Sequence, residues 1–286
     1  MHNIGTTIRY CKIPRFREYE INSFGEVRKV GENTHIESYL DNDTGEPRII
    51  LVNNFGDIVN IMVARLMLIT FIGEIELPII YKDNEDKWNV AMSNIKYKIP
   101  EYFKEQCSKP NITEVKLAGM RFRRIPKLPK YFISETGIVY SIRNKKFNSI
   151  SFDKDGYRFS SFFNYTNKKK PYRIHRLVFE TFEHEIKKGY VIDHFLSDKN
   201  MNNIGNLSEM TVLENNIKAY QMDGKVISHT KDEIRKLVSL KSENKSNKEI
   251  GEILGYNDNG DTVRALWYAI THNIAHFDIL NETKNN

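Results

Sequence analysis

The chain has 286 residues, enough for about two domains of ordinary size. Hydrophobic residues make up 40% of it and aromatic residues 12%, so packed cores are expected and a globally disordered chain is excluded. Its 43 Lys and Arg exceed its 37 Asp and Glu, and the formal charge of +6 favours an anionic partner, nucleic acid before membrane.

The cysteines and the apolar segments exclude further classes of protein. Cys11 and Cys107 form neither a CxxC pair nor a disulfide framework, so a zinc knuckle is not supported and a reducing compartment fits. The first ten residues lack the apolar region of a signal peptide. The most apolar run, residues 58–73, is short for a membrane span and contains Arg65, which favours a buried helix. We therefore expect a soluble, cytoplasmic protein.

A strand pattern opens the chain and returns later. Residues Tyr19–Val27 alternate in polarity and run into a glycine, which is typical of a strand leading into a turn. Residues 98–120 contain Pro100 and Pro110, and these prolines predict a linker without continuous regular structure. The alternating pattern then returns at Tyr131–Val139.

The segment after residue 150 carries a hairpin and a cluster of basic residues. Asp155-Gly156 is a hairpin turn signal, and the aromatic-rich residues 157–163 predict the strand that follows it. A basic loop at Lys168–Lys170 precedes predicted strand residues at 172–174. Residues 175–182 are expected to begin a helix.

Residues 190–216 bring together side chains that can do chemistry. The β-branched pair Val191-Ile192 predicts a strand that ends at Asp193-His194, and a polar, Asn-rich loop follows. Residues 208–220 then predict a helix from the spacing of their apolar positions. Carboxylate and amide oxygens suit a hard divalent cation such as magnesium, and a histidine beside them can take a proton near neutral pH.

A separate helical module is predicted at residues 229–286, after a linker. Thr230 and Glu233 form a capping-box pattern, residues 246–255 predict a short helix closed by glycine, and residues 261–270 predict a third helix. This order is that of a helix-turn-helix, whose third helix enters the major groove of DNA. A helical bundle without a DNA role is the alternative. The candidate DNA contacts of the third helix are Thr262, Arg264 and Tyr268.

The first two thirds of the chain contain an internal repeat. Residues 9–27 align without gaps on residues 121–139, with seven identical pairs in nineteen positions. Residues 64–75 align on residues 175–186, and the offset stays at 111 to 112 residues. We interpret the repeat as one domain that has been duplicated. The identical pairs are Arg9/Arg121, Ile13/Ile125, Pro14/Pro126, Tyr19/Tyr131, Ile21/Ile133, Gly25/Gly137 and Val27/Val139.

The two copies differ where the chemistry lies. Asp193 and His194 align with Tyr81 and Lys82, or with Lys82 and Asp83 if the one-residue gap is moved. Neither placement restores an Asp-His pair in the first copy. We expect it to have no metal site and no base. Two roles then remain open for it, packing against the second copy and contact with DNA.

Five short motifs in the second copy point to a family. Their order resembles the HNH (ββα-metal) nuclease module of phage and intron homing endonucleases. The family letters fall on His194, Asn206 and Asn215, with eleven and eight residues between them. Many members keep a histidine in the last place, whereas this chain has an asparagine, as a subgroup of homing enzymes does. The motifs are HRLV at 175–178, VIDH at 191–194, NN at 202–203, NL at 206–207 and EN at 214–215.

The resemblance implies a role for each of these residues. His194 would be the general base that activates a water molecule, and Asn206 would hold the loop through backbone hydrogen bonds. Asp193 and Asn215 would bind one Mg²⁺ or Mn²⁺ ion in the second copy. The implied activity is that of a metal-dependent DNA endonuclease, a hydrolase of phosphodiester bonds.

The fold and the domain boundaries follow from the repeat, the resemblance and the tail. We expect an α+β protein with two tandem HNH-like units, the first degenerate, and a small all-α helix-turn-helix tail. The degenerate unit would span residues 1–108, the active nuclease domain residues 109–222, and the tail residues 229–286.

Double-stranded DNA is the implied partner of a monomeric enzyme, encoded by a phage and working in a bacterial host cell. A solvated basic loop is the default interpretation of a lysine run, but beside a nuclease site phosphate contact is favoured. The alternative function is an inactive, sequence-specific DNA-binding or transcription-regulating protein that keeps the HNH scaffold. His175 is more often a scaffold residue in such folds, with phosphate contact as the other role. The candidate DNA contacts beside the site are Lys168, Lys169, Lys170, Arg173, His175 and Arg176.

Overall fold

The computed structural model describes residues 9–82, 86–163, 168–212, 214–215, 218, 229–256 and 259–271. The chain divides into two compact units, residues 1–186 with 194–208 and residues 187–193 with 209–286. No helix in the described ranges combines the length and the apolar character that a membrane crossing needs.

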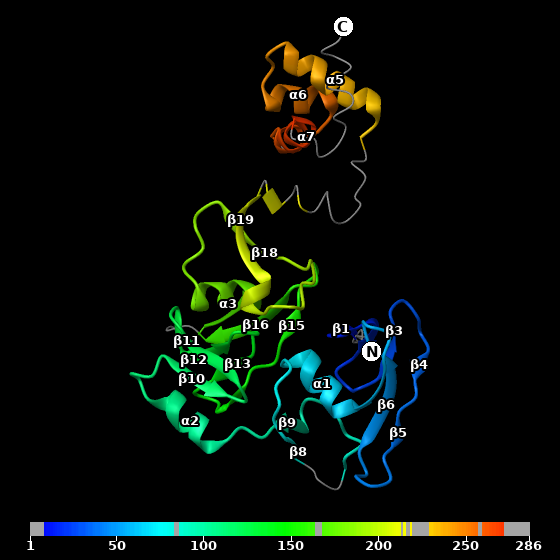
Figure 1. The fold of residues 1–286 in the computed structure, drawn as a ribbon, viewed down its shortest axis with the longest axis vertical. Coiled ribbons are helices and arrows are strands. Elements are labelled where there is room, and N and C mark those ends of the chain that lie inside the picture. Colours follow the sequence, from blue (N-terminus) through cyan, green and yellow to red (C-terminus); the bar gives the residue numbers. More distant parts are fainter. Residues whose placement is uncertain are drawn as a thin grey trace, which may run out of the picture. The chain divides into compact units, whose positions relative to one another are not determined.

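The first half of the larger unit consists of small antiparallel sheets around one helix (Figure 1). Helix α1 (Val63–Phe71) directly follows strand β7 and is almost entirely buried. The apolar run at residues 58–73 is therefore a strand followed by a helix and not a single helix, because residues 58–62 pair with β6. The strands are β1 (Cys11–Ile13), β2 (Phe16–Ile21), β3 (Val27–Lys29) and β4 (His35–Ile36) in one sheet, β5 (Tyr39–Leu40), β6 (Pro47–Val52) and β7 (Ile58–Met62) in another, and β8 (Ile79–Tyr81) with β9 (Ile95–Tyr97).

The second half is built on a five-stranded antiparallel sheet, a three-stranded sheet and helix α3 (Ile174–Phe182). Helix α3 contacts both sheets, and it begins one residue before the predicted position. The strands are β10 (Glu114–Leu117), β11 (Met120–Ile125), β12 (Leu128–Ser134), β13 (Val139–Ser141) and β14 (Lys146–Phe147) in the larger sheet, and β15 (Ser151–Phe152), β16 (Arg158–Phe163) and β17 (Lys169–Arg173) in the smaller.

The linker predicted between the two copies is largely regular structure, so that prediction was wrong. Helix α2 (Glu101–Ser108) begins immediately after Pro100 and ends before Pro110, and β10 follows. Proline is tolerated at a helix start because the amide it lacks has no intrahelical partner there. The two prolines therefore mark the ends of a short helix.

The last elements of the HNH-like stretch form a hairpin and a helical turn. Strand β18 (Tyr190–His194) pairs with β19 (Leu207–Thr211), and the 3₁₀ helix η1 (Ile204–Asn206) precedes β19. The helix predicted from residue 208 is corrected here, because residues 207–211 are a strand. The described residues after 211, namely 212, 214, 215 and 218, are helical.

The two halves have the same strand register at a constant offset. In β1 and β2, Cys11 pairs with Ile21 and a bulge follows Lys12; in β11 and β12, Arg123 pairs with Ile133 and a bulge follows Arg124. Hairpin β6–β7 and hairpin β16–β17 correspond in the same way, and α1 and α3 both have nine residues. The hydroxyl oxygens of Tyr19 and Tyr131 each accept a hydrogen bond from the amide at the end of the adjacent hairpin strand.

One hydrophobic core runs through both halves. Phe103 of α2 lies edge-on to Phe122 of β11 and to Tyr140 of β13, with ring centroids 5.1 and 5.0 Å apart. All three rings are fully buried and belong to one cluster with residues of α1 and β9. The packing of each half therefore includes side chains of the other.

The described part of the tail contains three short helices around their own core. These are α5 (Lys231–Ser242), α6 (Asn247–Leu254) and α7 (Asp261–Thr271). The predicted capping box of Thr230 and Glu233 is present, and Gly255 closes α6 in a left-handed conformation with φ +81°. Gly260 approaches α6 so closely that a Cβ there would lie 2.6 Å from the carbonyl carbon of Asn247. The core residues are Ile234, Leu237, Val238, Leu240, Ile250, Val263, Leu266, Ala269 and Ile270.

Candidate active site

His194, at the end of β18, is held in one orientation by Asn202. The ring is 3% exposed, and its Nε2 lies 3.0 Å from the Oδ1 of Asn202. The amide nitrogen of Asn202 donates to the backbone carbonyl of Asn200 at 3.3 Å, so its oxygen faces the histidine. An oxygen can only accept, and Nε2 must therefore carry the proton. The neutral ring then has its basic lone pair on Nδ1.

A second buried histidine, His175, packs against the ring of His194. The ring centroid of His175, in α3, lies 5.1 Å from that of His194 and 5.0 Å from that of Tyr157. Burial lowers the pKa of His175 to about 3, and the positive potential of His194, Arg173 and Arg176 acts in the same direction. His175 is therefore neutral at physiological pH. At 3% exposure its side chain has almost no surface to offer DNA, in contrast with the predicted contact.

Asn206 closes the loop that follows His194. Its Oδ1 accepts from the amide of Leu196 at 2.9 Å, and its Nδ2 donates to the carbonyl of Met201 at 2.8 Å. Its own carbonyl accepts from the amide of Phe195 at 2.8 Å. These are backbone hydrogen bonds of the kind the resemblance implies. They hold both ends of the loop that carries Asn202.

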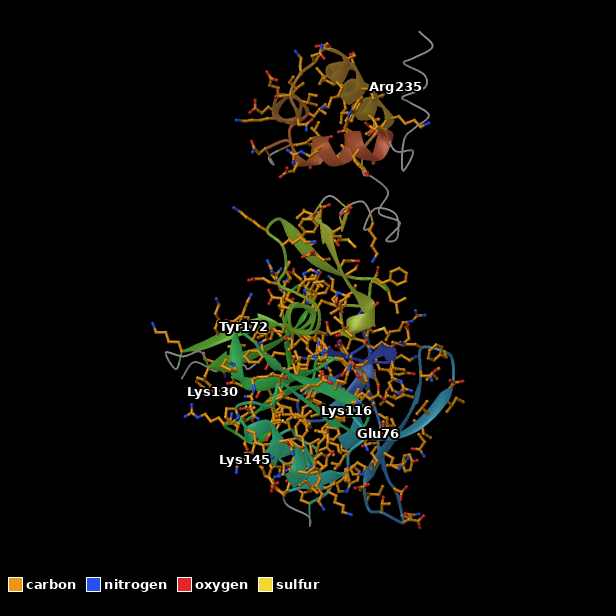
Figure 2. The ribbon with its side chains drawn as sticks, turned by 60° about the vertical axis from the view of Figure 1, so that its left-hand side comes forward. Glu76, Lys116, Lys130, Lys145, Tyr172 and Arg235 are labelled. Atoms are coloured by element: carbon orange, nitrogen blue, oxygen red, sulfur yellow. The ribbon has the colours of Figure 1, made fainter. Side chains whose placement is uncertain are left out.

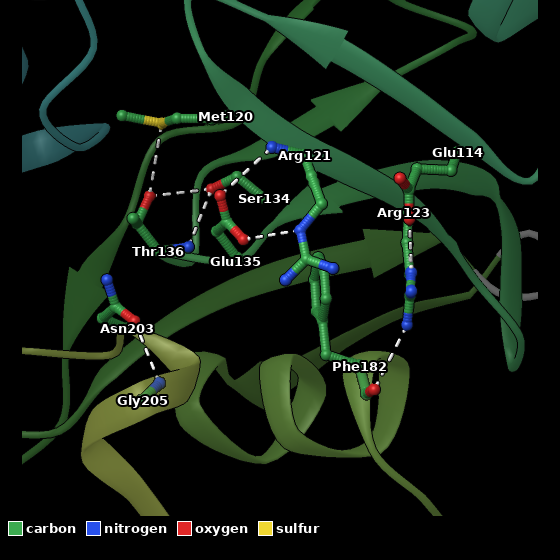
Figure 3. A network of polar contacts seen from close by, with 10 residues as sticks. All are labelled: Glu114, Met120, Arg121, Arg123, Ser134, Glu135, Thr136, Phe182, Asn203 and Gly205. Carbon is green, nitrogen blue, oxygen red and sulfur yellow. Dashed lines mark hydrogen bonds and ion pairs between the residues drawn. The ribbon is translucent and has the colours of Figure 1, made fainter.

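The turn after β12 contacts this loop, and Figure 3 shows polar contacts on both sides of it. The carbonyl of Glu135, in the turn after β12, accepts from the amide of Ile204, the first residue of η1, at 2.8 Å. Glu135 also pairs with Arg121 of β11 at 2.8 Å. Asn203 caps η1 by accepting from the amide of Gly205, as expected of an asparagine that starts a turn. The position of Asn202 thus depends on a sheet far away in the sequence.

Asp193 belongs to the other unit and has a different partner. Its carboxylate is ion-paired with the ammonium of Lys218, and both side chains are mostly buried, 17% and 20% exposed. Asn215 lies three residues before Lys218 in the helical stretch, so both occupy the same helix face.

The carboxylate of Asp193 and the side-chain amide of Asn215 are hard oxygen donors of the kind that a divalent cation prefers. The carboxylate already faces a positive charge, and the amide oxygen of Asn215 on the same helix face is a second hard donor. Bound there, an ion would exchange places with the ammonium of Lys218. The described residues contain no group of three or more His, Cys, Asp and Glu that could hold a metal. A site on Asp193 and Asn215 would therefore take its other ligands from water and substrate oxygens.

Some of the candidate DNA contacts form ion pairs within the protein, and others are exposed. Arg173 pairs with Asp153 at 2.6 Å and Asp155 at 3.2 Å, and it stacks over the ring of Tyr157. Arg264 pairs with Asp261 at 2.6 Å. Lys168, Lys169, Lys170 and Arg176 are exposed, and Thr262 and Tyr268 of α7 are partly exposed.

Two residues at the site were not predicted as such. Asn202 was placed only in an Asn-rich loop and given no role at the site, although the Asn-Asn pair at 202–203 is one of the motifs of the resemblance. Lys218 carried no signal, because a lysine near a helix end is ordinarily a solvated residue. Its contact with Asp193 joins residues 25 positions apart and becomes visible only in the folded chain.

This stretch is similar to HNH endonucleases. Residues 172–217 match the family model described as HNH endonuclease. The matched segment includes α3, β18, the Asn206 loop, β19 and Asn215.

The chain also resembles individual proteins over part of its length. It is 33% identical over 95 residues to YosQ of Bacillus subtilis (strain 168), a proposed HNH homing endonuclease derived from the SPbeta prophage. The match covers 32% of this chain and 53% of YosQ, so the chain spans about half the length of this curated relative. The chain is also similar to the HNH homing endonuclease I-HmuI in a solved structure that concerns DNA binding and cleavage. The match covers 42% of this chain and 67% of the I-HmuI chain, with 29% sequence identity and a TM-score of 0.34.

Proposed function

We propose that this protein is a metal-dependent HNH DNA endonuclease, a homing enzyme with one active centre. The observation that carries the proposal is the buried His194, held by Asn202 in a defined tautomer inside the segment that matches HNH endonucleases. A histidine held this way by protein groups is typical of a general base and is unusual for a surface residue of a binding module.

The reaction is hydrolysis of a DNA phosphodiester. A water oxygen attacks phosphorus, its proton passes to Nδ1 of His194, and the bond to the leaving oxygen breaks. Asp193 and Asn215 would hold one Mg²⁺ or Mn²⁺ ion, which neutralises charge on the phosphate and the leaving oxygen. Asn206 acts through the loop: it keeps Asn202, and with it the imidazole, in place.

The first half would be a degenerate copy of the nuclease unit. Equal strand registers, equal hairpins and helices of equal length support a duplication at an offset of 111 to 112 residues. Asn94 repeats the loop-closing bond of Asn206: its Nδ2 donates to the carbonyl five residues earlier, at 2.8 Å in both cases. Tyr81 and Lys82 stand where the second copy has Asp193 and His194. The first copy would thus retain the strands and the helix of the unit and lack the Asp-His pair.

The tail would be the DNA-anchoring module. Three helices around their own core, with the close approach at Gly260 before α7, support a helix-turn-helix arrangement. Thr262, Arg264 and Tyr268 of α7 would reach bases or phosphates. The lysines at 168–170 and Arg176 would contact the backbone near the cut.

One centre per chain predicts that a monomer nicks one strand of double-stranded DNA. The similarity to a prophage-derived protein supports a phage-encoded enzyme that works in a bacterial cell. Paired chains would be needed for a double-strand break.

Incubation of the purified protein with supercoiled plasmid and Mg²⁺ tests this function. Open-circular product that is lost in EDTA and in His194→Ala is the expected result. DNA binding without cleavage in Mg²⁺ or Mn²⁺ would overturn the proposal and identify a binding protein on an HNH scaffold.

A further inference from the structure

The larger unit contains a basic groove outside the HNH-like stretch. The groove has a volume of about 470 Å³ and is lined by residues between Ile72 and Lys104 and between Asn144 and Ser149. Strands β8 and β9, helix α2 and the turn between β13 and β14 contribute to it. None of the residues assigned to catalysis or to DNA contact above lies in its wall.

Lysine dominates the charge of this groove. Among the described residues that line it, Glu101 is the one acid, and it is paired with Lys104 at 2.5 Å. The same carboxylate also interacts electrostatically with Lys145, so the described lining holds one acid and six lysines. The six lysines of the groove, called the groove lysines below, are Lys82, Lys96, Lys98, Lys104, Lys145 and Lys146.

The backbone aims these side chains outward together. Burial alternates along β9 and the two residues that follow it. Ile95, Tyr97 and Ile99 are buried, while Lys96 and Lys98 are exposed. Alternate residues of a strand point to opposite faces, so the buried core on one face places both lysines on the other. Lys145 and Lys146 also line the groove, from the turn after β13 and the start of β14, and Figure 2 marks Lys145.

Like charges gathered in this way repel one another unless an anion lies between them. Several ammonium groups around one groove therefore raise the local positive potential. A lysine is a point charge and cannot read base edges as a bidentate group does. The groove therefore suits a chain of phosphates and not a particular sequence.

We propose that the groove lysines bind the phosphate backbone of duplex DNA, away from the strand that is cut. This inference rests on the proposed nuclease function, which makes DNA the substrate. It assigns the degenerate first half a direct role in holding that substrate, because residues 82–104 supply four of the six lysines. The contacts add affinity that is independent of base sequence.

The test compares two quadruple variants of the full-length protein. The groove variant carries Lys96→Gln, Lys98→Gln, Lys145→Gln and Lys146→Gln. The control variant removes the same charge outside the groove, through Lys12→Gln, Lys29→Gln, Lys116→Gln and Lys130→Gln, all exposed in the structure (Figure 2 marks Lys116 and Lys130). Binding to a 40-base-pair DNA duplex is measured in EDTA from about 50 to 300 mM salt, and thermal unfolding confirms that both variants fold.

Each phosphate contact contributes about 0.9 to the slope of log K against log salt concentration. We expect the groove variant to lose about 3 to 4 from this slope and to bind DNA about tenfold or more weakly at 0.1 M salt. The control variant should keep a slope within about 1 of the wild type. Equal slopes for the two variants would overturn the inference, as would a loss seen with an RNA duplex and absent with DNA.

Nicking of plasmid by the wild type, measured separately, distinguishes the two proposals. A wild type that nicks while the groove variant binds DNA normally refutes the groove and leaves the nuclease. A wild type that binds through the groove lysines and never nicks supports the groove and refutes the nuclease.

Discussion

Asn202 decides which nitrogen of His194 is basic. Because the amide nitrogen of Asn202 is engaged by the carbonyl of Asn200, the oxygen must face Nε2 of the histidine. A rotation of that amide would present a donor to Nε2 and would favour the other tautomer. Asn202 is a positioning residue, since it acts on the substrate only through the imidazole.

Asn202→Leu should slow plasmid nicking by about 10- to 100-fold, the usual effect of removing the partner that orients a site residue. Leucine has a similar size but cannot accept a hydrogen bond. The affinity for DNA, measured in EDTA, should not change. Asn202→Asp retains an acceptor oxygen and should restore the rate to within a few-fold. Equal rates for the leucine variant and the wild type would refute the positioning role.

His175 should make the protein less stable in acid. Its pKa is about 3 in the folded protein and about 6.5 in an unfolded chain, so the unfolded state binds more protons between these values. This contribution to stability is complete above about pH 6.5 and is lost progressively as the pH falls towards 3. Between pH 6.5 and 5.5 the wild type should lose about 1 kcal/mol more than His175→Phe in the free energy of unfolding. Urea titrations of both proteins at the two pH values measure this, and identical losses would refute it.

The sequence alone predicted the candidate catalytic and metal-binding residues, but it did not predict the residues that contact them. The order of His194, Asn206 and Asn215 follows a family pattern within one stretch of chain. The contacts of Asp193 with Lys218 and of Ile204 with Glu135 join distant positions that no local pattern links. Burial also cannot be read from a lone histidine, and His175 was therefore predicted to contact DNA.

Gly137 shows how one element depends on another. It lies in the turn after β12 with φ +95°, a conformation that side-chain-bearing residues rarely adopt. A Cβ there would lie 2.5 Å from Cγ2 of Ile174, at the start of α3, and 3.4 Å from Cβ of Asn202. The turn, the helix and the histidine-positioning loop therefore meet at a site where only glycine fits.

Gly137→Ala should lower the free energy of unfolding by about 3 kcal/mol or more, since backbone strain and overpacking both apply. Gly156→Ala is the matched control: φ is +83° there, but no atom lies within 4 Å of the added Cβ. It should cost only about 1 kcal/mol. Chemical denaturation of both variants compares the two values. A similar cost at both positions would contradict the close packing of α3 against the turn.

Local patterns predicted elements well where packing and pattern agree. The strands at β12 and β18, helix α3 and the capping box of α5 follow from alternation, helical spacing and cap residues. Residues 208–211 were predicted as helix because Met210 fits a helical spacing. Pairing with β18 overrides that preference, and such pairing is a tertiary effect.

At the scale of the whole molecule, the two halves share a core. Phe103 and Cys107 of α2 are fully buried, and Phe103 packs against Phe122 and Tyr140 of the second half. Arg158, fully buried in β16, donates to the carbonyls of Ile69 and Thr70 at the end of α1. Burial lowers the pKa of Arg158 to about 10, so it remains charged at neutral pH.

Residues 109–286 should not fold alone, because removal of the first half exposes the apolar surface that meets α1 and α2. We expect this fragment to aggregate or to unfold without a cooperative transition. Residues 1–228, which keep both halves, should unfold cooperatively. Circular dichroism during thermal unfolding compares the two fragments. A cooperative transition in residues 109–286 would show that the second half is an independent domain.

The central claim is that only the second copy contains an active site. The most direct test is to compare plasmid nicking by a variant of the second copy and a variant of the first copy. In Mg²⁺, His194→Ala should abolish all cleavage, whereas Tyr81→Phe, at the place in the first copy that corresponds to Asp193, should nick at the wild-type rate. The wild type should accumulate open circles before any linear product. Metal-dependent cleavage that persists in His194→Ala would contradict the account, since a second centre would then be cutting DNA.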